Sequence, residues 1–423
     1  MTISFNKPRE QTTKGGRLVL VLLSFLPIID TLNGFFPKVP IGKVYKMSLG
    51  LIVLGFLLIK HRKLKSKYLG FLVGTIAYIS LSISINIFLG GRLINIEYPL
   101  KLIFNVILMT SLIQCVEYGL FSGSDFYFVL NLSSWLFLGC YLIPYCLGIG
   151  NSVYSGGVGY KAFFIAQNEL GLVIVVFFFF TAYQLIYKIS FVNICKLACL
   201  LLCGMLLNTK TSIAACVIAI FVLFLTIVLR SKPAYKILVI LLLIVGLFVF
   251  KGTISKAING VQNRFNVLTA KYYDGSAITG LLSGRNYFVM DAWKELNTHH
   301  TLLRFFIGNG FCSDVLIEMD ILDIFFYLGA IGVIFIIIVL FFFFKMIVHN
   351  SREDIGNMRI ISYLVILAQL SIAGHVLFMA MSGCYFILYL CFLLFYKEVM
   401  QDVRVGEQII TCKNCTCLED ECF

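Results

Sequence analysis

The chain has 423 residues, of which 60% are hydrophobic, only 13% are charged and 40 are phenylalanine. A water-soluble protein cannot bury so much apolar surface, so the composition excludes a soluble domain and indicates a protein embedded in a lipid bilayer. The formal net charge of +13 is attributed to membrane topology and to contact with anionic lipids, and no nucleic-acid partner is expected.

Apolar runs recur along most of the chain. A spanning helix needs about 20 mainly apolar residues, and backbone within lipid must satisfy its own hydrogen bonds, which favours helices. The pattern predicts an all-α bundle of about twelve transmembrane helices near 18–36, 44–59, 68–89, 97–116, 126–149, 167–187, 192–208, 211–229, 235–250, 321–346, 358–378 and 380–396. The first run is expected to be a retained helix, and the phenylalanine runs 177–180 and 341–344 are expected to face lipid.

Lysine and arginine in short connections predict the orientation of such a bundle. They gather before the first helix, after the second, and in the connections after the eighth and tenth, all on one side, which we interpret as the cytoplasm. The expected organisation is a cytoplasmic N-terminus (1–17), helices 1–9 (18–250), a large extracytoplasmic loop (251–320), helices 10–12 (321–396) and a cytoplasmic cysteine-rich tail (397–423).

Several polar side chains lie at or near membrane depth. Each charge at a helix centre costs roughly 2.5–3.5 kcal/mol on insertion scales, so those that remain are candidates for function. These are Asp30, Lys161, Asn168, Glu169 and Lys210. Each also has a structural interpretation, because an acid can cap a helix or complement its dipole and a lysine can extend to the interface. Their shared position on the side of the long loop favours a common site.

The long loop carries a regular pattern of its own. Apolar residues between 254 and 272 recur at steps of three and four, which predicts an amphipathic helix with Arg264 on its polar side. Ser283-Gly284 then predicts the entry to a helix at 286–297, which leaves Arg285 near a helix N-terminus, where it can bind phosphate oxygens. The alternative is a surface ion pair of Arg285 with Asp291 or Glu295.

Three acids, Glu318, Asp320 and Asp323, follow where the next apolar run begins. Asp320 and Asp323 are three residues apart and share a helix face. Crowded carboxylates raise one another's pKa, which suits a general base. The alternatives are calcium binding, helix capping or simple solvation at a helix start.

Other titratable groups carry weaker signals. His375 is interpreted as a packing residue rather than a proton carrier, and His299-His300 lacks metal-ligand spacing. Cys412, Cys415, Cys417 and Cys422 could bind zinc but are interpreted as a reduced, dispensable tail. We expect neither a metal nor a cofactor.

In their order along the chain, these segments resemble the O-antigen ligase/polymerase superfamily, specifically the Wzy-type polymerases of capsule and exopolysaccharide clusters. The matching segments are Phe163 to Gly171, Thr209-Lys210-Thr211, Ser283-Gly284-Arg285, Ile307-Gly308-Asn309-Gly310, and the helix that begins with the three acids and contains Leu328-Gly329 and Gly332. The resemblance implies a bundle similar to GT-C glycosyltransferases in the bacterial cytoplasmic membrane.

The resemblance also implies a metal-independent reaction between two undecaprenyl-diphosphate glycans. The growing chain leaves its lipid diphosphate and joins a hydroxyl of a new repeat unit. We expect Arg285, helped by Arg264 and by Lys161 or Lys210, to hold the diphosphate, while Asn168 and Glu169 contribute to substrate binding. One carboxylate among Glu318, Asp320 and Asp323 would take the acceptor proton.

The implied partners are the glycan donor and acceptor, membrane lipids, a chain-length regulator and a flippase. Two other functions stay open. One is a flippase or transporter of the lipid-linked oligosaccharide, which the sequence disfavours because it shows neither matched halves nor broken helices. The other is an O-antigen-type ligase, although family ligases often carry a histidine where this chain has acids.

Overall fold

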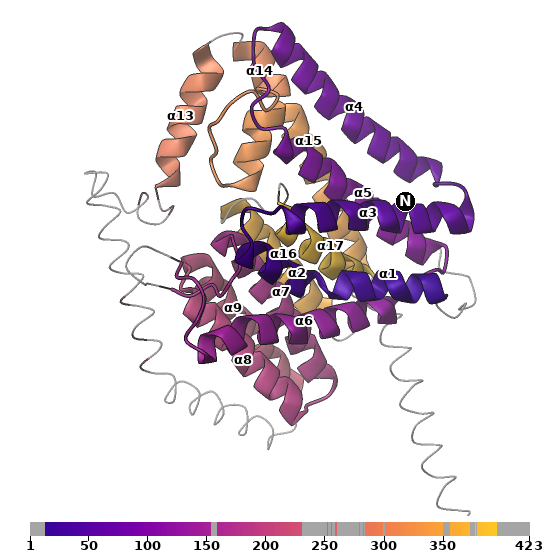
Figure 1. Ribbon diagram of the computed structural model, residues 1–423, viewed down its shortest axis with the longest axis vertical. Helices are drawn as coiled ribbons and strands as arrows, with labels where there is room; N and C mark the ends of the chain where they lie inside the picture. The colour runs from indigo at the N-terminus through magenta and orange to yellow at the C-terminus, as the bar shows by residue number, and fades with distance from the viewer. Residues whose placement is uncertain are drawn as a thin grey trace, which may run out of the picture.

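The computed structural model describes residues 13–153, 159–230, 252, 255, 259, 279, 282, 284–298, 301–349, 356–372, 377 and 379–395. In these residues the structure is almost entirely α-helical, without strands beyond one isolated bridge between Ser152 and Tyr160. The helices are α1 (Lys14–Ser24), α2 (Leu26–Phe35), α3 (Ile41–His61), α4 (Ser66–Phe88), α5 (Glu97–Glu117), α6 (Gly123–Cys146), α7 (Gln167–Tyr187), α8 (Phe191–Leu207), α9 (Lys210–Arg230), α13 (Arg285–Thr298), α14 (Thr301–Ile307), α15 (Asp320–His349), α16 (Gly356–Ile372) and α17 (Ala380–Leu394). Figure 1 shows α13 and α14 beside the start of α15 at one extremity of the molecule and α8 at the other.

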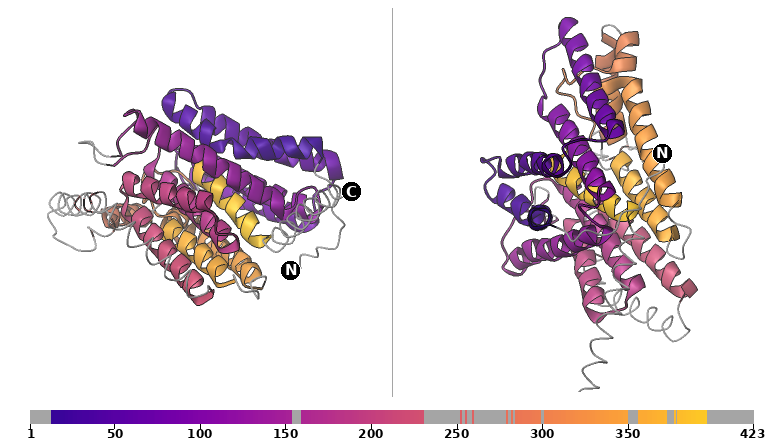
Figure 2. Two further views of the ribbon diagram at one scale, coloured as in Figure 1. Left: turned by 90° about the horizontal axis from the view of Figure 1, so that it is seen from below. Right: turned by 90° about the vertical axis from the view of Figure 1, so that its right-hand side faces the viewer.

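The long helices lie side by side (Figure 2, left), and their lengths bear on membrane insertion. In the described part of the chain, α3 to α7 and α15 are long and apolar enough to cross a bilayer, which makes six spans, or seven if the bent pair α1–α2 counts as one. They indicate a multi-pass membrane protein. The expected twelve spans are not reached, because α8, α16, α17 and the Thr211–Phe221 part of α9 are shorter apolar helices. The predicted run 235–250 lies outside the described residues.

The first predicted span is not straight. It is divided into α1 and α2, which meet at an angle of 44°. Pro27 stands in the first turn of α2, and proline cannot donate the hydrogen bond that would continue one straight helix through this point. The end of α2 packs tightly, since a Cβ on Gly34 would lie 1.4 Å from the carbonyl oxygen of Phe163.

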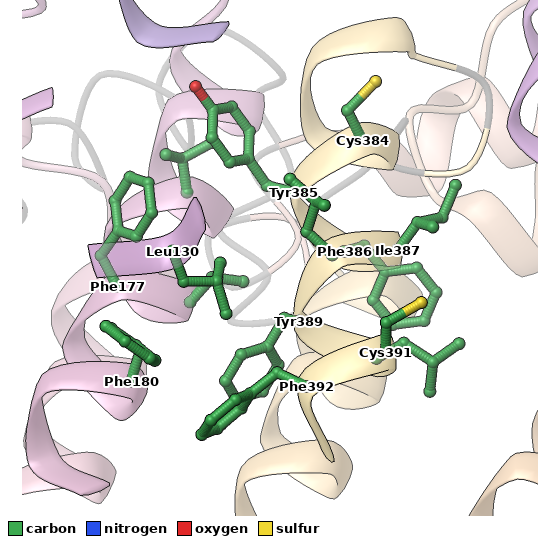
Figure 3. Close-up of a cluster of buried hydrophobic side chains, with 14 of the residues drawn as sticks. Leu130, Phe177, Phe180, Cys384, Tyr385, Phe386, Ile387, Tyr389, Cys391 and Phe392 are labelled. Atoms are coloured by element: carbon green, nitrogen blue, oxygen red, sulfur yellow. The ribbon is translucent and has the colours of Figure 1, made fainter. Parts of the chain in front are cut away.

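Helices α7 and α17 form the centre of the bundle. Every residue of α7 from Glu169 to Leu185 and every residue of α17 is buried. Figure 3 shows the rings of Phe177 and Phe180 pointing toward α17, where Phe177 meets Tyr385 edge to face with ring centroids 5.4 Å apart. The expectation that residues 177–180 face lipid was therefore wrong, because other helices surround α7 and a helix that is apolar all round belongs in the interior.

Helix α15 is broken at Gly329, whose φ of 65° and ψ of −171° are not helical. Backbone carbonyls near the break find partners outside the helix. Asn309 and Gly310 donate their N–H groups to Phe326 O and Tyr327 O at 2.9 and 3.0 Å, and the Tyr78 hydroxyl of α4 donates to Leu328 O. The expectation of unbroken helices was wrong here, because a non-local segment replaces the missing intrahelical bonds.

We expect Gly329→Ala to lower the apparent Tm of the purified protein in detergent. This combination of φ and ψ is essentially restricted to glycine, and strain of this kind costs about 1–3 kcal/mol. A Cβ would also lie 2.3 Å from the carbonyl of Phe306. Gly55→Ala in α3 is the matched control, because a Cβ there meets nothing within 4 Å and alanine favours a helix. Equal Tm values for the two variants would contradict the prediction.

Candidate functional site

Arg285 and Glu318 form an ion pair at the end of the bundle where α15 begins. The predicted helix at 286–297 is confirmed as α13, which begins at Arg285 after Gly284 in a left-handed conformation. Arg285 Nη2 lies 3.2 Å from Glu318 Oε2, and the side chains are 12% and 39% exposed. Arg285 Nε is buried and has no hydrogen-bond partner within the described residues. Among the described residues, the guanidinium therefore has one donor, Nε, that the pair with Glu318 does not use.

The two alternative partners suggested for Arg285 are engaged elsewhere. Asp291 pairs with Lys294 at 3.2 Å on the surface of α13, and Glu295 accepts a hydrogen bond of 2.6 Å from Ser313. The ion pair of Arg285 is thus not a local one. It joins the start of α13 to a residue 33 positions later in the chain.

Asp323 holds the turn that presents Glu318. Its carboxylate accepts the N–H groups of Ile317 and Met319, each at 2.9 Å, and these two residues flank Glu318. Glu318 itself has a φ of 62°, a conformation that costs energy for a residue with a side chain and that often marks functional sites. Asp323 is fully buried, so its geometry is that of a support for the turn.

Asp320 is also fully buried, and it faces a different segment. Its two carboxylate oxygens accept the Leu377 N–H at 3.4 and 3.2 Å, just before α17. The three acids predicted as one group are therefore in separate environments. Asp320 and Asp323 bind backbone N–H groups, whereas the side chain of Glu318 is 39% exposed. Arg285 and these three acids are called the arginine cluster below.

A second charged group lies inside the helical bundle. Asp30 of α2 forms a buried ion pair with Lys46 of α3, and Tyr385 lies next to Asp30. Glu169 of α7 is buried and interacts electrostatically with both charges. We call Asp30, Lys46 and Glu169 the lysine cluster. Asp30 lies inside α2 and pairs with Lys46, so it does not cap a helix. Burying two acids around one lysine carries a large desolvation cost.

The chain leading into α17 connects the two clusters. Asp320 binds its backbone at Leu377, and Glu169 accepts the Ser382 N–H at 3.3 Å. Asn105 of α5 donates to Leu377 O and Met379 O at 2.9 and 3.3 Å. A Cβ on Gly383 would lie 2.3 Å from the amide nitrogen of Asn105. Side chains of α5, α7 and α15 thus hold residues 377–383 in place. One of these side chains, Asp320, belongs to the arginine cluster and another, Glu169, to the lysine cluster.

The N-terminal turn of α5 adds further charge between the clusters. Glu97 is held by Lys43 at 2.6 Å and by Lys101 at 3.2 Å. Lys101 also lies over the ring of Tyr98, 5.3 Å from its centroid. The Tyr98 hydroxyl interacts electrostatically with Glu318 and Asp323 and also with Glu169. Basic, acidic and phenolic groups therefore gather where α3, α5, α7, α15 and α17 begin.

The remaining predicted residues are less closely placed. Lys161 donates to the carbonyl of Ile165 at 2.9 Å, a local contact, and Asn168 is half-buried at the start of α7. Lys210 is the first residue of α9. Arg264, with most of the predicted amphipathic helix at 254–272, lies outside the described residues. So do His299, His300, His375 and the four tail cysteines.

Sequence reasoning missed Lys46, Lys101 and Lys196. Lys196 is buried among α6, α7 and α8, with its ammonium 3.0 Å from Asn131 Oδ1 and 3.2 Å from Gln184 Oε1. All three lysines lie inside apolar runs, so the rule that selected Asp30 would have found them. Arg359, within the predicted span 358–378, is buried in α16 and donates to Leu393 O near the end of α17, where a cation is favourable.

Within the described residues, no three histidine, cysteine, aspartate or glutamate side chains are grouped to hold a metal ion. The arrangement instead offers a partly exposed guanidinium, an exposed carboxylate and several lysines. These groups can bind an anion and accept a proton. Neither the models of known protein families nor the curated proteins searched give a match to this chain.

Proposed function

We propose that this protein polymerises undecaprenyl-diphosphate-linked oligosaccharide repeat units at the outer face of the bacterial cytoplasmic membrane, as a Wzy-type polymerase with a GT-C-like bundle. The proposal rests on the sequence resemblance together with one observation, the Arg285–Glu318 pair. It combines a guanidinium, which can bind an anion, with a carboxylate that is 39% exposed. In this orientation both termini lie in the cytoplasm.

In this mechanism Arg285 binds the donor diphosphate and stabilises the charge that develops on it as the sugar–oxygen bond breaks. Arg264, Lys161 and Lys210 are proposed helpers, with Asn168 and Glu169 binding the glycan. Glu318 takes the proton from the acceptor hydroxyl, which forms the new glycosidic bond through an oxocarbenium-like transition state. The polyprenyl diphosphate leaves.

Among the three acids, exposure and hydrogen bonding favour Glu318 as the base. Asp320 and Asp323 already bind backbone N–H groups that shape the site, so protonating either one would weaken these contacts. They are therefore proposed as positioning residues. Substrate entering the site would displace Glu318 from Arg285. Arg285 would then bind the diphosphate, and Glu318 would accept the proton of the acceptor hydroxyl.

A strain that lacks the gene tests the function directly. We expect single repeat units on the outer side of the membrane and loss of the ladder of longer chains on a gel of lipid-linked and surface glycans. Single repeats trapped on the cytoplasmic leaflet would instead identify a flippase, an alternative that the broken helix α15 keeps open. Intact polymer that never reaches its final acceptor would identify a ligase.

Replacing Glu318 by glutamine should lower polymer synthesis by about 10²–10⁴-fold, the usual contribution of a general base. The side chain is 39% exposed, so protein level and Tm should stay close to those of the parent. Asp291→Asn is the control, because it removes an exposed acid paired on the surface of α13. Chain synthesis by Glu318→Gln at the rate of this control would exclude Glu318 as the base.

A further inference from the structure

An apolar cavity of about 300 Å³ lies among α4, α5, α15 and α17. Leucine, isoleucine, valine and phenylalanine side chains form most of its wall. Along α15 the wall extends from Leu328 to Phe343, and the helical part after the break at Gly329, residues 330–343, measures about 20 Å at 1.5 Å per residue. One leaflet of a bilayer is about 15 Å of hydrocarbon, so the wall is longer than one leaflet is deep.

The few polar side chains in the wall use their donors on the protein itself. Thr75 donates to Phe71 O at 2.8 Å, Tyr78 donates to Leu328 O, and Asn105 donates to Leu377 O at 2.9 Å. No donor of these three remains for a polar ligand in the cavity. The cavity therefore suits a hydrocarbon chain, which gains free energy by burial against apolar walls.

One end of the cavity adjoins the charged groups. Leu377, Asn105 and Gly383 belong to its wall, and the Leu377 N–H binds Asp320 of the arginine cluster. Ser382, the neighbour of Gly383, binds Glu169 of the lysine cluster. Lys101 of α5 places its ammonium 3.9 Å from Met379 Sδ in the same stretch, so a cation that can attract an anionic lipid head also lies beside this end.

We propose that this cavity holds the polyprenyl chain of the lipid-linked substrate while the diphosphate lies at the arginine cluster. The identity of the head group, a diphosphate, is taken from the proposed function, and this part of the assignment rests on it. The length of the wall favours an isoprenoid chain longer than one leaflet over a phospholipid acyl chain, which stays within its own leaflet. The Lys101 ammonium beside this end favours an anionic head group such as a diphosphate.

Gly74 of α4 allows the cavity to be filled without disturbing the fold. It lines the cavity, and a Cβ at this position meets nothing within 4 Å. Gly74→Phe therefore introduces a ring into the space for the chain. Gly70 lies one turn earlier on the same helix, outside the cavity wall, and a Cβ there also meets nothing within 4 Å. Gly70→Phe is the matched control for hydrophobicity and helix propensity.

The test uses the full-length protein in lipid nanodiscs and an isoprenoid diphosphate that carries a benzophenone on its chain. We expect photolabelling of the parent and of Gly70→Phe, competed by undecaprenyl diphosphate but not by phosphatidylglycerol. Gly74→Phe should label at least about tenfold less, which corresponds to about 1.4 kcal/mol of binding free energy, and Gly74→Leu should lie between. Thermal unfolding of each variant confirms that it is folded.

Two results would overturn the assignment. One is labelling of Gly74→Phe at the level of Gly70→Phe, and the other is equal competition by phosphatidylglycerol, which would make the occupant an ordinary membrane lipid. The readout needs no polymer synthesis. Labelling that responds to Gly74, combined with an unchanged glycan ladder in the deletion strain, would retain the cavity assignment and reject the polymerase.

Discussion

Arg285→Ala should abolish detectable polymer while the protein remains inserted in the membrane. Removal of one preorganised donor from a site of developing negative charge costs about 10²–10³ in rate, and Arg285 supplies several donors together. Arg285→Lys should restore only part of the activity, because an ammonium cannot reproduce the bidentate geometry of a guanidinium. The measurement is the chain-length distribution of the glycan in a complemented deletion strain.

Lys294→Ala is the control for this change. It removes a cation from the same helix, but one whose side chain is 72% exposed and pairs with Asp291 on the surface. Its polymer should match that of the parent. Normal polymer from Arg285→Ala at normal protein level would remove Arg285 from the mechanism, and full rescue by lysine would argue that charge alone is required.

Lys46→Met should destabilise the fold strongly. Removing one partner of a buried ion pair typically costs about 3–5 kcal/mol, because the other charge stays buried without compensation. Here two acids, Asp30 and Glu169, would lose their shared cation. We expect low membrane levels and a lower Tm in detergent for this variant than for the parent.

The double variant Asp30→Asn/Lys46→Met distinguishes the effect of an unpaired buried charge on stability from the effect of losing the pair on polymer synthesis. It removes both members of the pair, so its Tm should exceed that of Lys46→Met, with recovery limited by the remaining charge of Glu169. Polymer synthesis should stay low in both variants if the lysine cluster positions α17 for the reaction. If Lys46→Met were as stable as the parent, the prediction that the buried Asp30–Lys46 pair stabilises the fold would be contradicted.

Local pattern was sufficient for much of the helical architecture. Apolar runs predicted the positions of α3 to α7 closely, and Ser283-Gly284 predicted the start of α13, because helix length and capping are encoded by neighbours in sequence. The break at Gly329 was missed. It depends on the segment around Asn309, which replaces hydrogen bonds lost within α15, and no local rule reveals such a partner.

The candidate site was predicted in outline but not in its pairings. Arg285 and the three acids were selected as charged groups near a helix start. The Arg285–Glu318 pair and the contact of Asp320 with Leu377 join residues far apart in sequence, so local pattern could not reveal them. Lys46 lies in the predicted span 44–59 and was overlooked, although the search for charges within apolar runs applies to it as it does to Asp30. The proposed roles of Glu318 as base and Asp323 as positioning residue depend on which of them is buried. Sequence pattern alone does not predict this difference for two acids five residues apart.

The break in α15 has a consequence for the way the protein is made. A straight helix of this length would measure about 45 Å, more than the about 30 Å of a bilayer's hydrocarbon core. After the break, residues 330–349 alone measure about 30 Å, which matches the hydrocarbon core, so residues 320–328 are not needed to cross it. Asp320 and Asp323 then become buried only when Leu377, Ile317 and Met319 supply their N–H groups. The segment 320–328 therefore completes its hydrogen bonds only once the chain before α17, 57 residues later, is in place.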